Sequence, residues 1–260
     1  MPMRNSLIFI FCLRIIMGGE MASIRGKCFI VVGAGGGLGY AISKRLLESG
    51  AKVVISSRTR ENLEKLKGRL SKFGVVDYVA GDATKRDDAE RVASEAKKIM
   101  GRIDGAVIQV GDFLGDNFES FTADNAYKMV SANLVAPLTA VQAVSKAMDR
   151  GGAVVFVSNS EAAQTKKTST NLSYLVSKAA LNKAVEMVAA ELLPRGIRAN
   201  GIAPNSIADP EKSERSEMGS QEQRPEDLAG IAEWLLGEES VLVDGVVIQA
   251  DSGYRFARRR

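Results

Sequence analysis

Histidine is absent from the 260-residue sequence, and its absence excludes several kinds of active site. A serine hydrolase triad needs an imidazole base, and many zinc sites and proton shuttles depend on imidazole as well. Acid/base chemistry near neutral pH must therefore come from Tyr, Lys, Asp, Glu or Cys side chains. We predict no metal site.

Cysteine is also scarce, since the chain contains only Cys12 and Cys28. Two thiols do not make the disulfide framework that is typical of small secreted domains. Cys28 lies in an apolar run, where we expect a small buried residue. The composition therefore favours a cytoplasmic protein with reduced thiols.

The apolar segment from Leu7 to Met17 contains Arg14 and is shorter than the roughly 20 residues that a membrane-spanning helix needs. No cleavage site of a signal peptide follows it. We predict an N-terminal extension over residues 1–20, a single domain over residues 21–260, and no membrane partner. A membrane-associating or partner-binding helix at the N-terminus is the alternative.

The excess of positive charge lies in the C-terminal tail. The chain has 35 Lys and Arg against 31 Asp and Glu, and four of the arginines are Arg255, Arg258, Arg259 and Arg260. The rest of the chain is therefore neutral and has no electrostatic footprint for nucleic acid. We interpret the tail as solvated and predict no nucleic-acid partner.

Short apolar runs alternate with segments of helical periodicity along the chain. We expect strands at 27–32, 52–56, 75–79, 103–110, 153–158, 197–203 and 246–249, and helices at 39–49, 61–70, 87–99, 123–148, 172–193 and 225–236. Alternation of this kind predicts an α/β fold. We expect a doubly wound, mostly parallel seven-stranded sheet with helices on both faces.

A glycine-rich turn follows the first expected strand and contains Gly33, Gly37 and Gly39. Glycines at such a place let backbone N–H groups approach a pyrophosphate, and the next helix adds the positive end of its dipole. The turn therefore predicts a nucleotide site, with a flexible loop as the alternative.

The second strand ends without an acidic residue and continues as Ser57-Arg58. A carboxylate at this point binds the free 2′-hydroxyl of NAD, whereas an arginine accommodates the 2′-phosphate of NADP. Arg58 therefore predicts NADP as the cofactor. A solvated loop arginine is the alternative.

Tyr174 and Lys178 are four residues apart in an expected helix, so they share one face. A tyrosine with its ordinary pKa of roughly 10 is a poor base at neutral pH, and a nearby ammonium favours the phenolate. We expect Lys178 to lower the pKa of Tyr174, so that the pair serves as acid and base in hydride transfer.

These motifs together resemble the short-chain dehydrogenase/reductase family over about residues 26–254. Asn133, the stretch Arg198–Pro204 and the C-terminal segments 224–229 and 250–253 also match the family. The resemblance implies a Rossmann-type NADP-dependent oxidoreductase that acts on a carbonyl or secondary alcohol and forms a homo-oligomer, either a tetramer or a dimer. In pattern the chain most resembles 3-oxoacyl-carrier-protein reductases and general ketone or sugar dehydrogenases.

The resemblance also implies roles for single residues. The catalytic residues are Tyr174, Lys178, Asn133 and a serine. The cofactor-binding residues are Gly33, Gly37, Leu38, Gly39, Ser57, Arg58, Asp82, Ala83, Gly111, Tyr174, Lys178, Pro204 and Ile207. From its local sequence, Asp82 is equally well explained as a turn residue or a helix cap.

The family's serine has no unique counterpart here, because its usual position is occupied by Glu161. Alternation along an extended chain sends Ser158 and Ser160 to one side and Asn159 to the other. A hydroxyl can both donate to the substrate oxygen and accept from the phenol. We therefore predict Ser160 for this role, followed by Ser158 and then Asn159.

Two departures from the family pattern leave another interpretation open. Gln109 lies where the family has asparagine, and Asp209 lies where it has a threonine near the cofactor. An NADP-binding protein that has lost turnover is therefore the alternative function. A structural or membrane-associated subunit, suggested by Leu7 to Met17, is a third interpretation.

Overall fold

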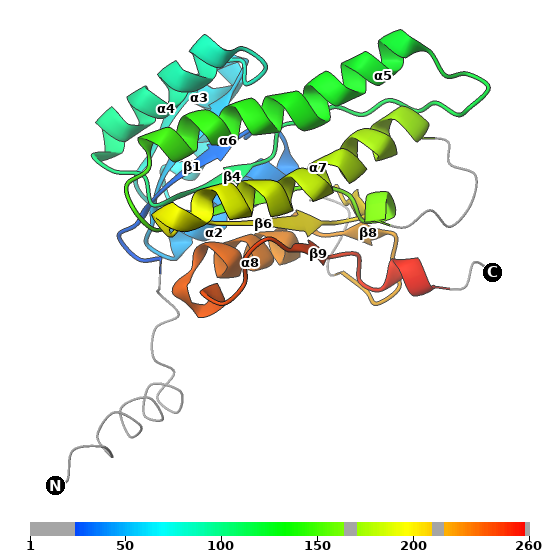
Figure 1. Cartoon of the computed structure of the whole chain (residues 1–260). Helices are drawn as coiled ribbons and strands as arrows, with labels where there is room; N and C mark the ends of the chain where they lie inside the picture. The colour runs from blue at the N-terminus through cyan, green and yellow to red at the C-terminus, as the bar shows by residue number, and fades with distance from the viewer. Residues whose placement is uncertain (1–23, 164–170, 210–215, 258–260) are drawn as a thin grey trace, which may run out of the picture.

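The computed structural model describes residues 24–163, 171–209 and 216–257. Seven strands form one sheet in the order β3-β2-β1-β4-β5-β6-β9 (Figure 1), and every neighbouring pair is parallel. The strands are β1 (Cys28–Val32), β2 (Lys52–Ser57), β3 (Val76–Ala80), β4 (Gly105–Ile108), β5 (Ala153–Val157), β6 (Arg198–Ala203) and β9 (Val247–Gln249). The predicted doubly wound fold is confirmed.

Helices cover both faces of the sheet. They are α2 (Gly37–Glu48), α3 (Arg60–Leu70), α4 (Arg86–Met100), α5 (Ala123–Val130), α6 (Ala136–Ala147), α7 (Leu172–Leu192) and α8 (Pro225–Leu236). The apolar sides of α2, α3 and α8 share one buried cluster, and those of α4, α6 and α7 share the other. The sheet lies between the two clusters, with its strands buried from both sides.

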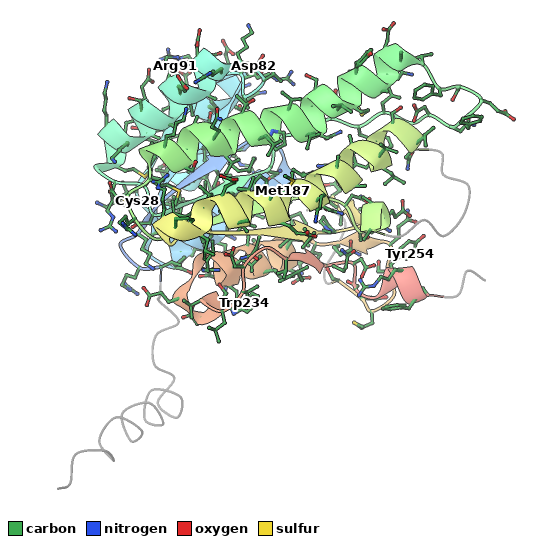
Figure 2. All side chains as sticks on the ribbon, in the orientation of Figure 1. Cys28, Asp82, Arg91, Met187, Trp234 and Tyr254 are labelled. Carbon is green, nitrogen blue, oxygen red and sulfur yellow. The ribbon has the colours of Figure 1, made fainter. Side chains whose placement is uncertain are left out.

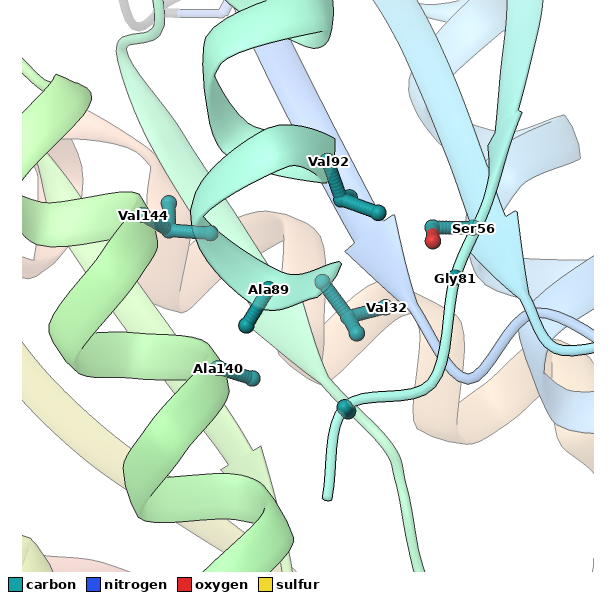
Figure 3. A pocket seen from close by; sticks show the side chains of 8 residues that line it. Val32, Ser56, Gly81, Ala89, Val92, Ala140 and Val144 are labelled. Carbon is teal, nitrogen blue, oxygen red and sulfur yellow. The ribbon is translucent and has the colours of Figure 1, made fainter. Parts of the chain in front are cut away.

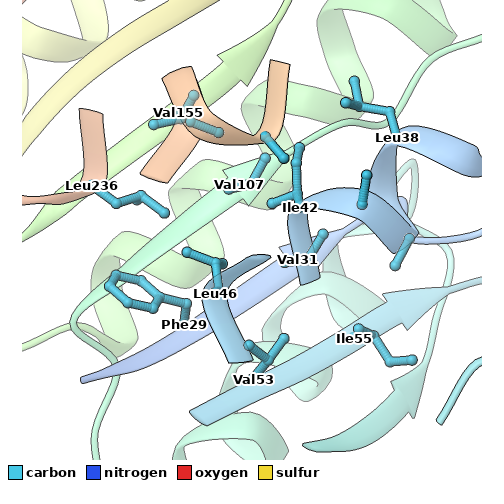
Figure 4. Close-up of a cluster of buried hydrophobic side chains, with 14 of the residues drawn as sticks. Phe29, Val31, Leu38, Ile42, Leu46, Val53, Ile55, Val107, Val155 and Leu236 are labelled. Atoms are coloured by element: carbon cyan, nitrogen blue, oxygen red, sulfur yellow. The ribbon is translucent and has the colours of Figure 1, made fainter. Parts of the chain in front are cut away.

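Strand β1 shows why the expected strands are continuously apolar. Phe29 and Val31 pack into one cluster and Ile30 into the other, and none of the three side chains is exposed. Figure 4 shows Phe29 and Val31 beside Leu46 and Ile42 of α2. Strands buried on both faces cannot alternate between polar and apolar residues.

The helix expected over residues 123–148 is interrupted. A π-helical segment, η1 (Ser131–Val135), separates α5 from α6. Pro137 follows it and has no N–H group to donate to the carbonyl of Asn133, which lies four residues earlier. Because π segments often occur at functional sites, the position of Asn133 inside this one bears on the site described below.

Other predictions concern the ends of the chain. Cys28 is a buried free thiol (Figure 2), as expected. The interpretation of the tail as solvated is wrong for Arg255, because its guanidinium forms an ion pair with the buried carboxylate of Asp251. The predicted extension over residues 1–20, Cys12 and the last three arginines lie outside the described residues. No helix within the described ranges is long and apolar enough to cross a membrane.

Candidate active site

The glycine turn is shaped by close backbone contacts. Gly33 has a φ angle of +93°, and a Cβ atom there would lie 2.8 Å from the backbone of Gln109 and Val110. A Cβ atom on Gly39 would lie 2.7 Å from the Cα atom of Ala34. Only glycine meets these requirements, so the turn can join β1 to the N-terminus of α2 without side chains in the way.

The same turn adjoins a buried polar atom that has no partner. The side-chain oxygen of Gln109 is buried and makes no hydrogen bond within the described part of the chain. It lies 3.3 Å from the position that a Cβ atom on Gly39 would take. A buried acceptor of this kind needs a donor, and the hydroxyl groups of a ribose are donors. The residues present therefore fit a nucleotide at this turn.

The end of β2 lies beside the glycine turn. The Cβ atom of Ser57 is 4.0 Å from where a Cβ atom on Gly35 would be. Arg58 is exposed and forms no hydrogen bond or ion pair with any described residue. Its positive charge is one of the causes that lower the pKa of Asp82, after the hydrogen bond from the backbone of Thr84. Arg58 therefore lies near the carboxyl ends of β2 and β3 and is available to bind an anion.

Asp82 has a structural role in the turn after β3. Its Oδ1 atom accepts hydrogen bonds from the backbone N–H group of Thr84 at 3.0 Å and from the Thr84 hydroxyl at 2.8 Å. Asp82 lies at the same end of the molecule as Arg91 of α4 (Figure 2). The interpretation as a turn residue is thereby confirmed, and contact with a cofactor stays a prediction.

A small, mostly apolar hollow lies next to this turn (Figure 3). Val32 and Ser56 line it from the ends of β1 and β2, and Ala83 lines it from the loop after β3. Its other lining residues are Gly81, Ala89, Val92, Ala140 and Val144. Tyr174 and Lys178 are not among them, so the hollow is distinct from the place where those two side chains meet.

Lys178 lies on α7 and is buried, with only 6% of its surface exposed to solvent. Its Nζ atom donates a hydrogen bond to the carbonyl oxygen of Val157, 3.1 Å away at the end of β5. Burial lowers the pKa of this lysine to about 8. The lysine is therefore held in place by the sheet, and its charge is sensitive to mildly alkaline pH.

Tyr174 precedes Lys178 by one turn of α7, and the side chain of Asn159 lies near enough to its phenol to influence the phenol's pKa. Burial raises the pKa of Tyr174 to about 12, the side chain of Asn159 opposes this rise, and the charge of Glu161 adds to it. The expectation that Lys178 lowers this pKa is wrong for the protein alone. The Nζ atom lies 6.0 Å from the centre of the tyrosine ring and is bound to β5, so burial dominates.

Asn133 and Gly111 lie against Lys178. The Asn133 side chain is fully buried and binds the backbone of Asp112 twice, by accepting from its N–H group at 3.0 Å and donating to its carbonyl at 2.9 Å. A Cβ atom on Gly111 would lie 2.6 Å from the Oδ1 atom of Asn133 and 3.4 Å from the Nζ atom of Lys178. The π segment thus brings Asn133 to the lysine and the loop after β4.

The three candidates for the serine role are arranged differently from the expectation. Strand β5 ends at Val157, and a 3-10 helix, η2 (Ser160–Ala163), follows, so alternation along an extended chain does not apply. Ser158 donates to the side chain of Asn182, and the N–H group of Ser160 donates to the carbonyl of Pro204 at 2.8 Å. Asn159, the third candidate, is the one of the three that lowers the pKa of the Tyr174 phenol.

The segment after β6 also reaches this edge of the sheet. The side-chain nitrogen of Asn159 donates to the carbonyl of Asn205 at 2.8 Å, so residues 204 and 205 adjoin the end of β5. Ile207 lies in a short strand, β7 (Ser206–Ile207), which pairs with β8 (Glu222–Gln223), and it is partly exposed. The predicted cofactor residues Pro204 and Ile207 therefore flank the site.

Sequence reasoning missed two residues in the loop after β4. Asp116 is buried, and its carboxylate accepts hydrogen bonds from the backbone and the hydroxyl of Ser173, where α7 begins. The ring of Phe113 contacts the ring of Tyr174 edge-on, with 5.1 Å between the ring centres. The sequence carries no local signal for either contact, because each joins residues that are far apart along the chain.

The site as a whole lies at the carboxyl ends of the parallel strands. Ser57 is the last residue of β2. The other members follow their strands: the glycine turn follows β1, Asp82 follows β3, Gly111 follows β4, Asn159 follows β5 and Pro204 follows β6. Open parallel sheets bind their ligands at this edge, where the strand order reverses between β1 and β4. A group of three or more Asp, Glu or Cys side chains arranged for a metal ion is absent from the described residues.

Comparison with known proteins agrees with this arrangement. The family model for short chain dehydrogenases matches residues 27–219. The chain is 33% identical over 251 residues to the human dehydrogenase/reductase SDR family member 4, with 88% of each chain covered. It is 28% identical over 243 residues to glucose 1-dehydrogenase of Gluconobacter oxydans, with 88% of this chain and 91% of that protein covered.

A solved structure agrees as well. A blue fluorescent protein from a metagenomic library, in complex with NADPH, superposes with a TM-score of 0.79 at 25% identity, covering 89% of this chain and 99% of that one. The fold, the order of the site residues and the match over residues 27–219 lead to one conclusion. The chain belongs to the short-chain dehydrogenase/reductase family and is an oxidoreductase that uses a nicotinamide cofactor.

Proposed function

We propose that this protein transfers a hydride between NADP(H) and the carbonyl or secondary alcohol group of a small molecule, with Tyr174 as the acid/base residue. The observation that carries the proposal is the meeting of Tyr174, Lys178 and Asn133 beside the loop after β4. The nicotinamide supplies or accepts the hydride when it is bound.

The state of Tyr174 suits the proton-donating role in carbonyl reduction. A phenol whose pKa is about 12 carries its proton at neutral pH. It can therefore give that proton to a carbonyl oxygen as the hydride reaches the carbon. Lys178 keeps a positive charge below its pKa of about 8, with its Nζ atom 6.0 Å from the centre of the tyrosine ring.

The preference for NADP over NAD is a separate part of the proposal. It is supported by Arg58, which is exposed and has no partner among the described residues next to the glycine turn. A guanidinium can bind a phosphate through two parallel hydrogen bonds. The relative that was solved with NADPH is consistent with this choice. Gly33, Gly37, Leu38 and Gly39 would hold the pyrophosphate, and the buried oxygen of Gln109 would accept from a ribose.

We further propose Asn159, in place of our sequence-based choice Ser160, as the group that orients the substrate oxygen. Its support is its place beside the phenol of Tyr174, whose pKa it lowers, at the end of β5. The amide oxygen of Asn159 accepts from the N–H group of Glu161, and its nitrogen donates one of its two N–H groups to the carbonyl of Asn205. The second N–H group can donate to an oxygen. Ser158 would help to position α7, because it binds Asn182 one turn after Lys178.

The competing function is an NADP-binding protein without turnover, which the unusual Gln109 and Asp209 suggest. A screen of NADPH oxidation against ketones, aldehydes and acyl thioesters separates the two. Oxidation that depends on a carbonyl compound and on Tyr174 supports the enzyme. Saturable NADPH binding without oxidation of NADPH on any member of the panel supports the binding protein.

The homo-oligomer and the cytoplasmic location also belong to the proposal. Support for an oligomer comes from large apolar side chains that are exposed on neighbouring helices, which Figure 1 shows running side by side. These are Tyr127 on α5, Val135 next to α6, and Val176 and Met187 on α7. Exposed apolar side chains that gather on one face are typical of surfaces that bind protein.

A further inference from the structure

A short strap crosses the site from the end of β4 to the beginning of α7. It comprises residues 111–116 and is fixed at both ends. At the first end, the side chain of Asn133 binds the N–H and carbonyl groups of Asp112. At the second end, the carboxylate of Asp116 binds Ser173, and the carbonyl of Asp116 accepts from the N–H group of Leu172 at 2.9 Å.

Phe113 projects from the middle of this strap. Its ring lies edge-on to the ring of Tyr174 with 5.1 Å between centres and an interplanar angle of 70°. The side chain is nevertheless 60% exposed. An aromatic ring that is held beside the reactive phenol, with most of its surface uncovered, can contact whatever binds to that phenol.

The substrate must approach the hydroxyl of Tyr174 to receive its proton, because proton transfer requires hydrogen-bond distance. The groups attached to the substrate carbonyl then lie within reach of Phe113. Glu161 also adds negative charge near the same phenol and raises its pKa. The phenol therefore has both an aromatic ring and a negative charge in its surroundings.

We infer that Phe113 forms an aromatic wall of the substrate pocket, so that the preferred substrates are neutral ketones and aldehydes that carry an aryl group on the carbonyl carbon. This inference rests on the proposed function. A flat ring packs against a phenyl side chain in the offset or edge-on arrangements that aromatic pairs prefer, and a puckered saturated ring does not. An anionic substituent would be repelled by Glu161.

Two other phenylalanines provide matched controls. Phe118 and Phe121 follow the strap, and Phe118 is even more exposed than Phe113, at 89%. Neither forms a ring pair with Tyr174 within the described residues. If the exposed aromatic side chains in this region acted only through nonspecific hydrophobic contact, all three would contribute equally to the preference for aryl substrates.

The experiment compares acetophenone with cyclohexyl methyl ketone, which have the same carbon skeleton but a flat and a puckered ring. We expect kcat/KM for acetophenone to exceed that for the saturated ketone by about three- to tenfold, as expected for one aromatic contact. Phe113→Leu should abolish this ratio. Phe113→Tyr, which keeps the ring, and Phe118→Leu should both preserve it.

The inference is overturned if Phe113→Leu keeps the ratio, or if Phe118→Leu abolishes it equally. Turnover of 2-butanone reports on the proposed function independently, because this ketone has no ring. If none of the ketones is reduced, calorimetric binding of the two ring compounds to the NADPH-loaded protein provides the same comparison. Equal affinity for both in the unmodified protein would then reject the aromatic wall, whereas a preference lost in Phe113→Leu supports it.

Discussion

Asp116 and Ser173 are 57 positions apart in the sequence, yet the carboxylate of Asp116 accepts both the backbone N–H and the hydroxyl hydrogen bond of Ser173 in the first turn of α7. Asn171, at the N-cap position, makes no capping hydrogen bond through its side chain. The helix that carries Tyr174 therefore receives its cap, and a negative charge at the positive end of its dipole, from a distant loop.

Asp116→Ala should therefore weaken both the fold and the activity. It leaves two buried donors of Ser173 without a partner, which we expect to lower the free energy of unfolding by about 1–3 kcal/mol. It should also lower kcat, because Tyr174 follows Ser173 directly. Urea unfolding and NADPH oxidation measure the two effects. The control is Glu119→Ala, which removes an exposed carboxylate and should change stability by no more than about 0.5 kcal/mol. Equal behaviour of the two variants would refute the capping role.

Tyr174→Phe should abolish turnover while leaving cofactor binding intact, because it removes the transferable proton and keeps the ring that contacts Phe113. Loss of a positioned acid typically lowers the rate by about 10²–10⁴-fold. Single-turnover measurements with NADPH and a ketone give the rate, and quenching of protein fluorescence gives the affinity for NADPH. Retention of most of the wild-type rate would remove Tyr174 from the chemistry.

Lys178→Met should make the protein more stable at neutral pH, although we expect it to lose activity. Burial lowers the pKa of Lys178 from 10.5 to about 8, so the folded protein carries a penalty for the charged form that is fully present below pH 8. The shift corresponds to an upper bound of about 3 kcal/mol.

The dependence of this effect on pH has a definite sign. Between about pH 8 and 10.5, the unfolded chain keeps a proton that the folded lysine has lost, so the free energy of unfolding of the wild type rises with pH. The advantage of Lys178→Met should therefore shrink as pH increases through this window. The control is Lys183→Met, since Lys183 is an exposed lysine of the same helix that pairs with Glu186. A constant difference from pH 7 to pH 10 would contradict the assignment.

Arg58→Ala should remove most of the preference for NADPH over NADH. A charge-assisted bidentate contact with phosphate contributes about 1.5–3 kcal/mol, so the wild type should bind NADPH some ten- to hundredfold more tightly. Arg60→Ala is the matched control, since Arg60 is two residues away and its charge is paired with Glu64 at 3.1 Å. Dissociation constants for both cofactors, measured by fluorescence, decide the matter. Equal affinities in the unmodified protein would exclude Arg58 as the selecting residue.

Asn159→Ala should have the largest effect among the three candidates for the serine role. Loss of a hydrogen bond to the reacting oxygen typically lowers turnover about a hundredfold or more. Ser160→Ala should remain within a few-fold of wild type, and Ser158→Ala should act mainly through the stability of α7. All three are compared at saturating NADPH. A collapse of Ser160→Ala alone would restore the sequence-based choice.

The fold was accessible from the sequence because a sheet buried on both faces leaves a simple pattern. Runs such as 28–32 and 153–157 consist of apolar residues alone, and Gly33 marks the end of the first of them. Local rules were sufficient there, because each strand needs only burial and a turn.

Features of the site that depend on contacts between residues far apart in the chain could not be predicted from the sequence. The capping of α7 by Asp116 joins two loops that only the folded chain brings together. The raised pKa of Tyr174 depends chiefly on burial, which no local sequence pattern reports. The break in the helix between α5 and α6 had a visible cause in Pro137, but helical periodicity on both sides concealed it.

The way in which the strap is anchored suggests a route to redesign by directed evolution. The side chain of Asn133 binds only backbone atoms of Asp112, which any residue at position 112 would provide. At the other end of the strap, the only side chain that anchoring requires is the carboxylate of Asp116. Positions 113 to 115 therefore lie between two anchored residues, Asp112 and Asp116, and form no hydrogen bond that holds the sheet together. A combinatorial library restricted to these three codons should yield new selectivities without the loss of stability that usually limits such searches.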